Sequence, residues 1–234
     1  MKKLILLFAI AAFSFGFTGS NVCDGNDYFV SGTVSKMGYY KADGTQTGTG
    51  TSKVTSVTTS GDSTIAWIET EYVSDKMKEP HKSNFRFVCA NGVMMLDISS
   101  MMAGMASGNG MEMTVEGDQA KYPANLSVGQ TLDDVNMTMK MMMKGELFST
   151  TKMRIFERKV ESLETLKTPA GSFECYKISY KTESTMEMHG KTIPIPARKT
   201  VQYFCKRCGV VRSEEYSAEG TMSSYSELLE LKKP

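Results

Sequence analysis

Apolar and polar residues alternate with a period of two along most of this chain, which is the pattern of half-buried β-strands. In residues 83–89 (SNFRFVC), for example, Phe85, Phe87 and Cys89 fall on one face. Asn91-Gly92 follows directly and is a strong signal for a two-residue hairpin turn. The same alternation predicts further strands at 33–40, 50–59, 64–73, 93–98, 111–116, 135–143, 145–160, 172–183, 192–204, 210–217 and 221–226.

A helical period is almost missing from the pattern, since no apolar repeat of 3.6 residues is sustained before the last few residues. We expect a short helix at 99–105, a turn at 108–110, and either an amphipathic helix or a final strand at 226–233. Many short strands joined by tight turns favour an all-β fold, a single antiparallel sheet curled into a barrel or half-barrel. No linker divides it, so we expect one domain over residues 22–231 and a solvated tail at 232–234.

The first twenty residues have the features of a secretory signal peptide. Two lysines at 2–3 precede an apolar run at 4–17, and small residues follow at 18–20. We expect cleavage after Ser20, with Gly16 as the competing site. The run is too short for a comfortable transmembrane helix, and no later stretch is long and apolar enough to span a bilayer. The sequence therefore predicts export to the periplasm or beyond the cell.

The cysteines bear on the compartment and on membrane attachment. A lipoprotein signal requires a small residue before the acceptor cysteine, but Val22 precedes Cys23, so we expect no lipid anchor. All five cysteines follow the predicted cleavage site, and in an oxidising compartment they are more often paired than free. Because five is odd, at least one is left over or pairs outside the chain. The five are Cys23, Cys89, Cys175, Cys205 and Cys208.

Composition narrows the possible functions of the 234 residues. The net charge is +1, and removing residues 1–20 takes away two lysines and no acids, which leaves −1. Such a balance argues against a nucleic-acid partner, because phosphate binding requires a basic face. The chain has two histidines, no G-x-S-x-G elbow and no phosphate-binding glycine loop. We therefore expect a protein with no catalytic residues and no cofactor, not an enzyme.

Four stretches of the sequence resemble a known family. They are 87–92 continuing to 96–98, 126–134 (LSVGQTLDD), 168–178 (TPAGSFECYKI), and 209–214 (GVVRSE) with Tyr216, 224–225 and Leu228. Together they resemble the TapB-like domain-of-unknown-function family of bacterial secreted proteins. Its fold is similar to that of the lipoprotein carriers LolA and LolB, which implies an incomplete antiparallel barrel around an apolar cavity, outside the cytoplasm. The resemblance implies no catalytic residues. This chain departs from the family pattern at 27–30 and in carrying Cys205 and Cys208.

Cys205-Lys206-Arg207-Cys208 has the two-residue spacing of redox motifs and of half a zinc site, although this motif alone is a weak signal. A strand hairpin centred on Gly190 places Cys175 opposite Cys205, within disulfide reach. We favour a structural disulfide from Cys175 to Cys205 or Cys208. The alternatives are an adjacent Cys205–Cys208 bond and a metal or redox role.

Cys23 and Cys89 are then the natural second pair, which would tie the N-terminus to the sheet. Such a bond closes a long loop and would contribute about 4 kcal/mol to stability.

Methionine is the other unusual feature, since the chain contains 19 and they cluster. In 135–143, alternation puts four methionines on one face, which we expect to be buried, and the lysines in water. The same spacing recurs at 111–113 and 186–188. Methionine is flexible and polarizable, so a concave face lined with it would suit an apolar or lipid-like ligand. The candidate ligand-binding residues are Met137, Met139, Met141, Met143, Met111 and Met113.

Two other functions fit the same methionines. Thioethers are soft ligands that select Cu(I), and Met186-Glu187-Met188-His189 adds an imidazole, so a periplasmic copper protein is one alternative. The other is a structural component of the cell envelope whose methionines only fill its core. A methionine-lined cavity would favour the ligand-binding protein, converging sulfur atoms the metal protein, and a closed dry core the structural one.

Overall fold

The computed structural model describes Cys23, residues 25–106 and residues 111–234. The predicted signal peptide at 1–20 and the predicted turn at 108–110 lie outside the described residues. In the part that is described, no helix has the length and apolar character needed to cross a membrane.

The described residues form one sheet of thirteen strands with two short helices. In chain order the elements are η1 (Asp27–Phe29), β1 (Val34–Lys41), β2 (Gln46–Ser60), β3 (Ser63–Ser74), β4 (His81–Ala90), β5 (Val93–Leu96), α1 (Ile98–Ala106), β6 (Met111–Gly117), β7 (Lys121–Pro123), β8 (Val135–Met143), β9 (Glu146–Thr168), β10 (Gly171–Met188), β11 (Lys191–Cys205), β12 (Gly209–Tyr216) and β13 (Met222–Lys232).

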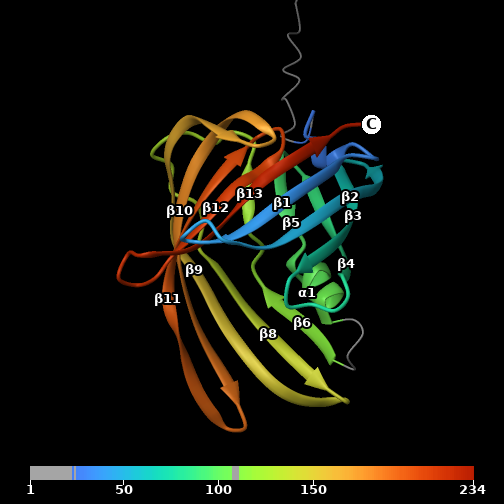
Figure 1. Ribbon diagram of the computed structural model, residues 1–234. Coiled ribbons are helices and arrows are strands. Elements are labelled where there is room, and N and C mark those ends of the chain that lie inside the picture. Colours follow the sequence, from blue (N-terminus) through green and yellow to red (C-terminus); the bar gives the residue numbers. More distant parts are fainter. Residues whose placement is uncertain (1–22, 24, 107–110) are drawn as a thin grey trace, which may run out of the picture.

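The strand order is β6-β8-β9-β10-β11-β12-β13-β1-β2-β3-β4-β5-β7, and every neighbouring pair is antiparallel. β6 and β7 are the two edges, so the sheet curls without closing (Figure 1). The predicted all-β half-barrel is confirmed. The segment at 226–233, which the sequence left open between helix and strand, belongs to β13.

β9 extends to Thr168, beyond the predicted end at 160, and contains a bulge at Glu157. Glu157 has φ of 53°, and the pairing with β10 shifts between Ser179 and Lys181. The extra residue turns Arg158 inward after Ile155, so the side chains do not keep one phase along the strand. Beyond residue 160 the polar Ser162 and Glu164 take the more buried phase and Leu163 the exposed one, so no apolar alternation marks the continuation to Thr168.

One half of the interior is filled. Its buried cluster includes Cys89, Val160, Ile178 and Phe204, and the Tyr122 ring stacks on Phe204 with 4.6 Å between the ring centroids. Tyr122 belongs to β7, which the sequence pattern did not predict, because three residues are too few to establish an alternation. This packing closes the upper half of the molecule in the view of Figure 1.

Both chain ends of the domain are fixed to the sheet. A disulfide joins Cys23 to Cys89, with 6.2 Å between the Cα atoms. Residues 232–234, predicted as a solvated tail, are exposed, while Lys232 ends β13 and the Lys233 ammonium lies 2.9 Å from the buried Asp27 carboxylate. A buried carboxylate needs a charged partner, and Lys233 supplies one.

Candidate ligand-binding site

The methionines of β6 and β8 form one face. Met111 pairs directly with Met143 and Met113 with Met141, and partners opposite each other in an antiparallel pair have side chains on the same side. Val115 and Gly117 continue β6 opposite Met139 and Met137. The two methionine rows that the sequence picked out separately are therefore adjacent, although β6 and β8 are not consecutive strands.

The same face continues across β9 and β10. Met153 of β9 lies between Met137 on β8 and Ser184 on β10, and Met186 of β10 pairs with Ile193 of β11. We call this surface of β6 and β8–β11 the methionine face. The sequence analysis did not select Met153, although its period-two spacing from Ile155 was a signal that could have found it.

The predicted burial of the methionine row holds only at one end. Met137 is 6% exposed because it packs in a cluster with Ile98 of α1 and with Val135. Met139 and Met141 are half-buried, and Met143 is 37% exposed. The expectation of four buried methionines is therefore wrong for the outer part of the strand, since α1 covers only the inner end.

α1 is positioned by its capping residue and by one ion pair. The Ser100 N–H donates to the Asp97 carboxylate at 3.0 Å, which caps the first turn of the helix. The same carboxylate pairs with Arg86 on β4. The predicted helix at 99–105 is thus confirmed with nearly the expected bounds, and it partly fills the open half-barrel.

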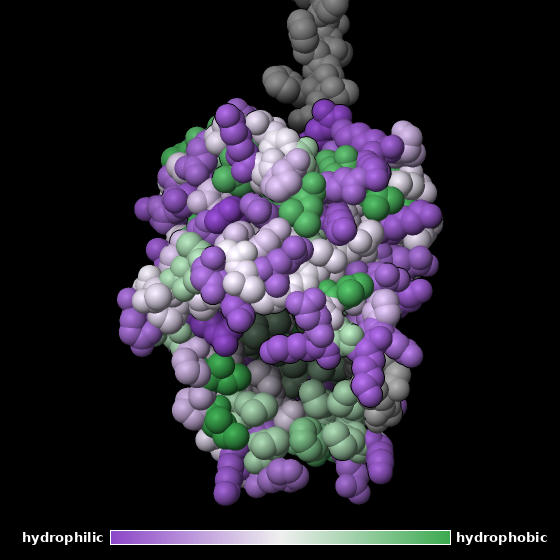
Figure 2. All heavy atoms as spheres, viewed as in Figure 1, coloured by the Kyte–Doolittle hydropathy of each residue, from purple (hydrophilic) through white to green (hydrophobic). Residues whose placement is uncertain are grey.

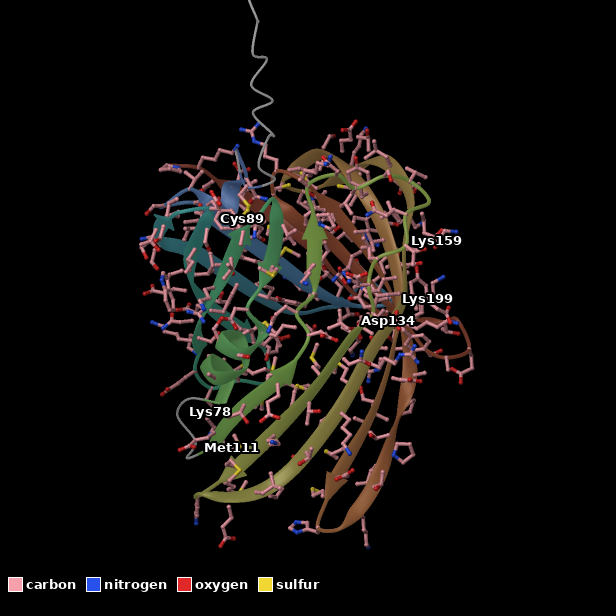
Figure 3. The ribbon with its side chains drawn as sticks, turned by 180° about the vertical axis from the view of Figure 1, so that it is seen from behind. Lys78, Cys89, Met111, Asp134, Lys159 and Lys199 are labelled. Carbon is pink, nitrogen blue, oxygen red and sulfur yellow. A yellow bond between two sulfur atoms is a disulfide. The ribbon has the colours of Figure 1, made fainter. Side chains whose placement is uncertain are left out.

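Beyond α1 the methionine face is hollowed. A cavity of about 740 Å³ runs along the cross-strand row Gly117, Met137, Met153, Ser184 and Ile195. Most of its other lining residues, such as Lys152 and Thr185, alternate with this row and belong to the opposite face of the sheet. Figure 2 shows the hollow in the lower half of the molecule, with hydrophobic side chains on its walls. Met111, at the start of β6, lies at the end of the methionine face that is remote from Cys89 and the filled half (Figure 3). Of the six predicted ligand-binding residues, Met137 lines this cavity.

The charges around the cavity are paired. Arg154 contacts Asp134 at 2.8 Å and Glu183 at 3.6 Å, and the hydrogen bond from Arg154 to Asp134 raises the pKa of the guanidinium. Lys152 contacts Glu187 at 3.1 Å. Lys152 and Arg154 flank Met153 in the strand, so these paired charges lie on the opposite side of the sheet from the methionine face.

The copper site at 186–189 stays a prediction. Met186 lies on the methionine face, whereas His189 is in the hairpin turn with φ of 49° and packs edge-on against Phe148 at 5.7 Å. Among the described residues, no group of three or more His, Cys, Asp or Glu side chains is arranged to hold a metal ion.

The three cysteines near the β10–β11 hairpin are close together but reduced. Tyr176 pairs with Phe204, so Cys175 comes next to Cys205 in register, as the hairpin argument predicted. The predicted disulfides among Cys175, Cys205 and Cys208 are nevertheless not formed. Instead the Cys175 thiol donates to the Phe173 carbonyl at 3.5 Å, and the other two sulfur atoms hydrogen-bond each other.

Fold and site together define an open antiparallel half-barrel with an apolar, methionine-lined concavity. The chain belongs to the DUF3108-like family, whose sequence profile matches residues 30–228. The narrower TapB-like resemblance is not tested by this match and stays a prediction. No curated protein matches the chain in sequence.

Two crystal structures share the fold. One is a candidate lipoprotein from Parabacteroides distasonis, with a TM-score of 0.69 and 22% identity over 88% of this chain and 98% of the other. The second is a candidate exported protein with a YmcC-like fold from Bacteroides fragilis, with a TM-score of 0.65 and 23% identity over 87% of this chain and 96% of the other. At this identity the similarity establishes the architecture alone.

Proposed function

We propose that this protein is an exported, non-enzymatic binding protein that holds an elongated apolar ligand, such as an acyl chain, on the methionine face. The observation that carries the proposal is the methionine face itself, on which Met139, Met141 and Met143 remain partly exposed in the open half-barrel. A TapB-like, LolA/LolB-type half-barrel would use its concave side in the same way.

Physical chemistry favours an apolar ligand over a charged one. Thioether side chains adapt to varied apolar shapes, and Lys152 and Arg154 lie on the opposite face of the sheet, so neither is available to an anionic headgroup on the methionine face. Burying about 200 Å² of acyl surface would contribute on the order of 5 kcal/mol before the entropy cost of binding. That is enough for a carrier, which must also release its ligand.

We further propose that the mature chain carries no lipid anchor. In a lipoprotein the lipid is attached to the sulfur of the first mature cysteine, which in this chain would be Cys23. Here the Cys23 sulfur is bonded to Cys89, and one sulfur atom cannot take part in both bonds. The disulfide also favours an oxidising compartment, in keeping with export.

The test is native mass spectrometry of the mature protein from an envelope fraction, followed by solvent extraction. We expect a bound mass that extracts as lipid. Displacement of a fluorescent fatty acid then maps the site: Ile195→Glu should weaken binding at least tenfold, because it places a charge on the methionine face. Val128→Glu, on an exposed loop residue, is the matched control and should bind like the wild type. Equal affinity of both variants would refute the proposed site.

A further inference from the structure

The turn between β11 and β12 holds two thiols for which the ligand-binding proposal has no role. Cys205 ends β11 and pairs with Gly209 at the start of β12, so Cys208 folds back onto Cys205. Gly209 has φ of 72° and lies against the Tyr28 ring, which a Cβ at this position would overlap. Packing therefore fixes the turn in one conformation.

The N-terminal segment clamps this turn from outside. The Asn26 side-chain amide donates to the Lys206 carbonyl at 2.8 Å, and the Asp27 N–H donates to the Arg207 carbonyl at 2.7 Å. The Asp27 carboxylate also lies 3.7 Å from the Arg207 guanidinium, besides its contact with Lys233. Two exposed cations are thus held beside the thiols, and the backbone that carries the thiols cannot move freely.

The two thiols face a cavity of about 500 Å³. Cys205 is 7% exposed and Cys208 is 4% exposed, and both line this cavity together with Phe173 of β10. The charged groups around the cavity are Asp27, Glu174, Lys206, Arg207 and Lys233. Cations outnumber acids there, so an anionic molecule would be attracted to the thiols.

The thiols differ in reactivity. The Cys208 thiol donates a hydrogen bond to the Cys205 sulfur, and backbone N–H groups add to it, which lowers the pKa of Cys205 from 9.0 to about 6 despite burial. The same hydrogen bond raises the pKa of Cys208. Burial raises the pKa of the neighbouring Cys175 to about 12. The lowered pKa makes Cys205 the most readily ionised of the three thiols, and a thiolate is the nucleophile in exchange with disulfides.

We propose that Cys205 and Cys208 form a thiol–disulfide exchange site for a small anionic disulfide that enters this cavity. The Cys205 thiolate attacks one sulfur of the incoming disulfide, whose S–S bond breaks and releases one thiolate. Cys208 then gives up its proton, attacks the Cys205 sulfur and expels the second thiolate. The thiolate–thiol pair of the protein loses two electrons and the Cys208 proton, and the small disulfide leaves as one thiolate and one thiol. Cys205–Cys208 becomes an intramolecular disulfide.

Intact-mass measurement of the reduced full mature chain with oxidised glutathione tests this site, with the cationic disulfide cystamine in parallel. The wild type should lose two hydrogen atoms, gain no stable adduct, and yield a peptide with the Cys205–Cys208 bond. Cys208→Ser should trap one glutathione on Cys205, whereas Cys205→Ser should trap none. Cys175→Ser is the matched control and should behave like the wild type. Glutathione disulfide should react several-fold faster than cystamine.

Two results would overturn the proposal. One is a Cys208→Ser protein that keeps the wild-type melting temperature but forms no adduct without denaturant. The other is a Cys205–Cys208 bond that reduced glutathione cannot reopen in the folded protein, which would mark it as structural. Equal rates with both disulfides would refute the preference for an anionic substrate. Fatty-acid binding is measured on the same variants, and because the methionine face is distinct from this cavity, either site can fail alone.

Discussion

Replacing Arg158 by methionine tests how the filled and hollow halves of the barrel are held together. Arg158 is 3% exposed, and its guanidinium donates to the carbonyls of Asp133 at 2.8 Å and Lys121 at 3.2 Å. It also lies 5.9 Å from the centroid of the Tyr122 ring. These contacts fix the connection between β7 and β8 against β9, where the packed core gives way to the open cavity.

The expected loss in the free energy of unfolding follows from the contacts that the substitution removes. Hydrogen bonds from a charged group contribute about 1.5–3 kcal/mol each, and the two carbonyls would lose their partner. Removing a buried charge recovers part of this, since its desolvation cost disappears. Methionine conserves most of the volume, so we expect Arg158→Met to lower the free energy of unfolding by about 2–4 kcal/mol. For a chain of this size that is a fall of roughly 5–15 °C in melting temperature.

Urea denaturation followed by tryptophan fluorescence measures the change, with Lys159→Met as the control. Lys159 is the next residue and its side chain is exposed, so its replacement should stay within about 0.5 kcal/mol of the wild type. An unchanged m-value would show that the difference lies in stability alone. If Arg158→Met unfolds at the same urea concentration as the control, the Arg158 contacts do not stabilise the fold and the reasoning is refuted.

Three further predictions follow from single contacts. Gly117→Ala should cost at least about 2 kcal/mol, because φ is 120° and a Cβ would overlap the Asn136 carbonyl; a melting temperature equal to that of the wild type would contradict this. Cys89→Ser removes the disulfide to Cys23, which closes a loop of 66 residues, so the free energy of unfolding measured in urea should fall by about 4 kcal/mol. Dithiothreitol should destabilise the wild type but not this variant. Alkylation of Cys205 by iodoacetamide should rise with pH to a midpoint near 6, as its lowered pKa requires; a midpoint near 9 would mean an ordinary thiol.

Local sequence patterns predicted strands and their register correctly where the alternation of side chains follows a regular period. The alternation in 83–89 and the Asn91-Gly92 turn predicted the β4–β5 hairpin, and the Cys175–Cys205 register came from counting residues around Gly190. That register holds because a two-residue turn and a bulge between Thr182 and Ser184 offset each other. The last part of β9, by contrast, has polar Ser162 and Glu164 in its more buried phase, so no apolar alternation revealed it.

The sequence by itself determined that the chain is all-β and that Met137, Met139, Met141 and Met143 share one side of their strand, because side-chain alternation is a property of the local backbone. Only the tertiary structure decided that β6 lies beside β8, that α1 buries Met137 but leaves Met143 open, and that Cys205 and Cys208 meet a cavity. Those outcomes depend on contacts between residues far apart in the chain. No period in the sequence encodes which face is covered and which stays hollow.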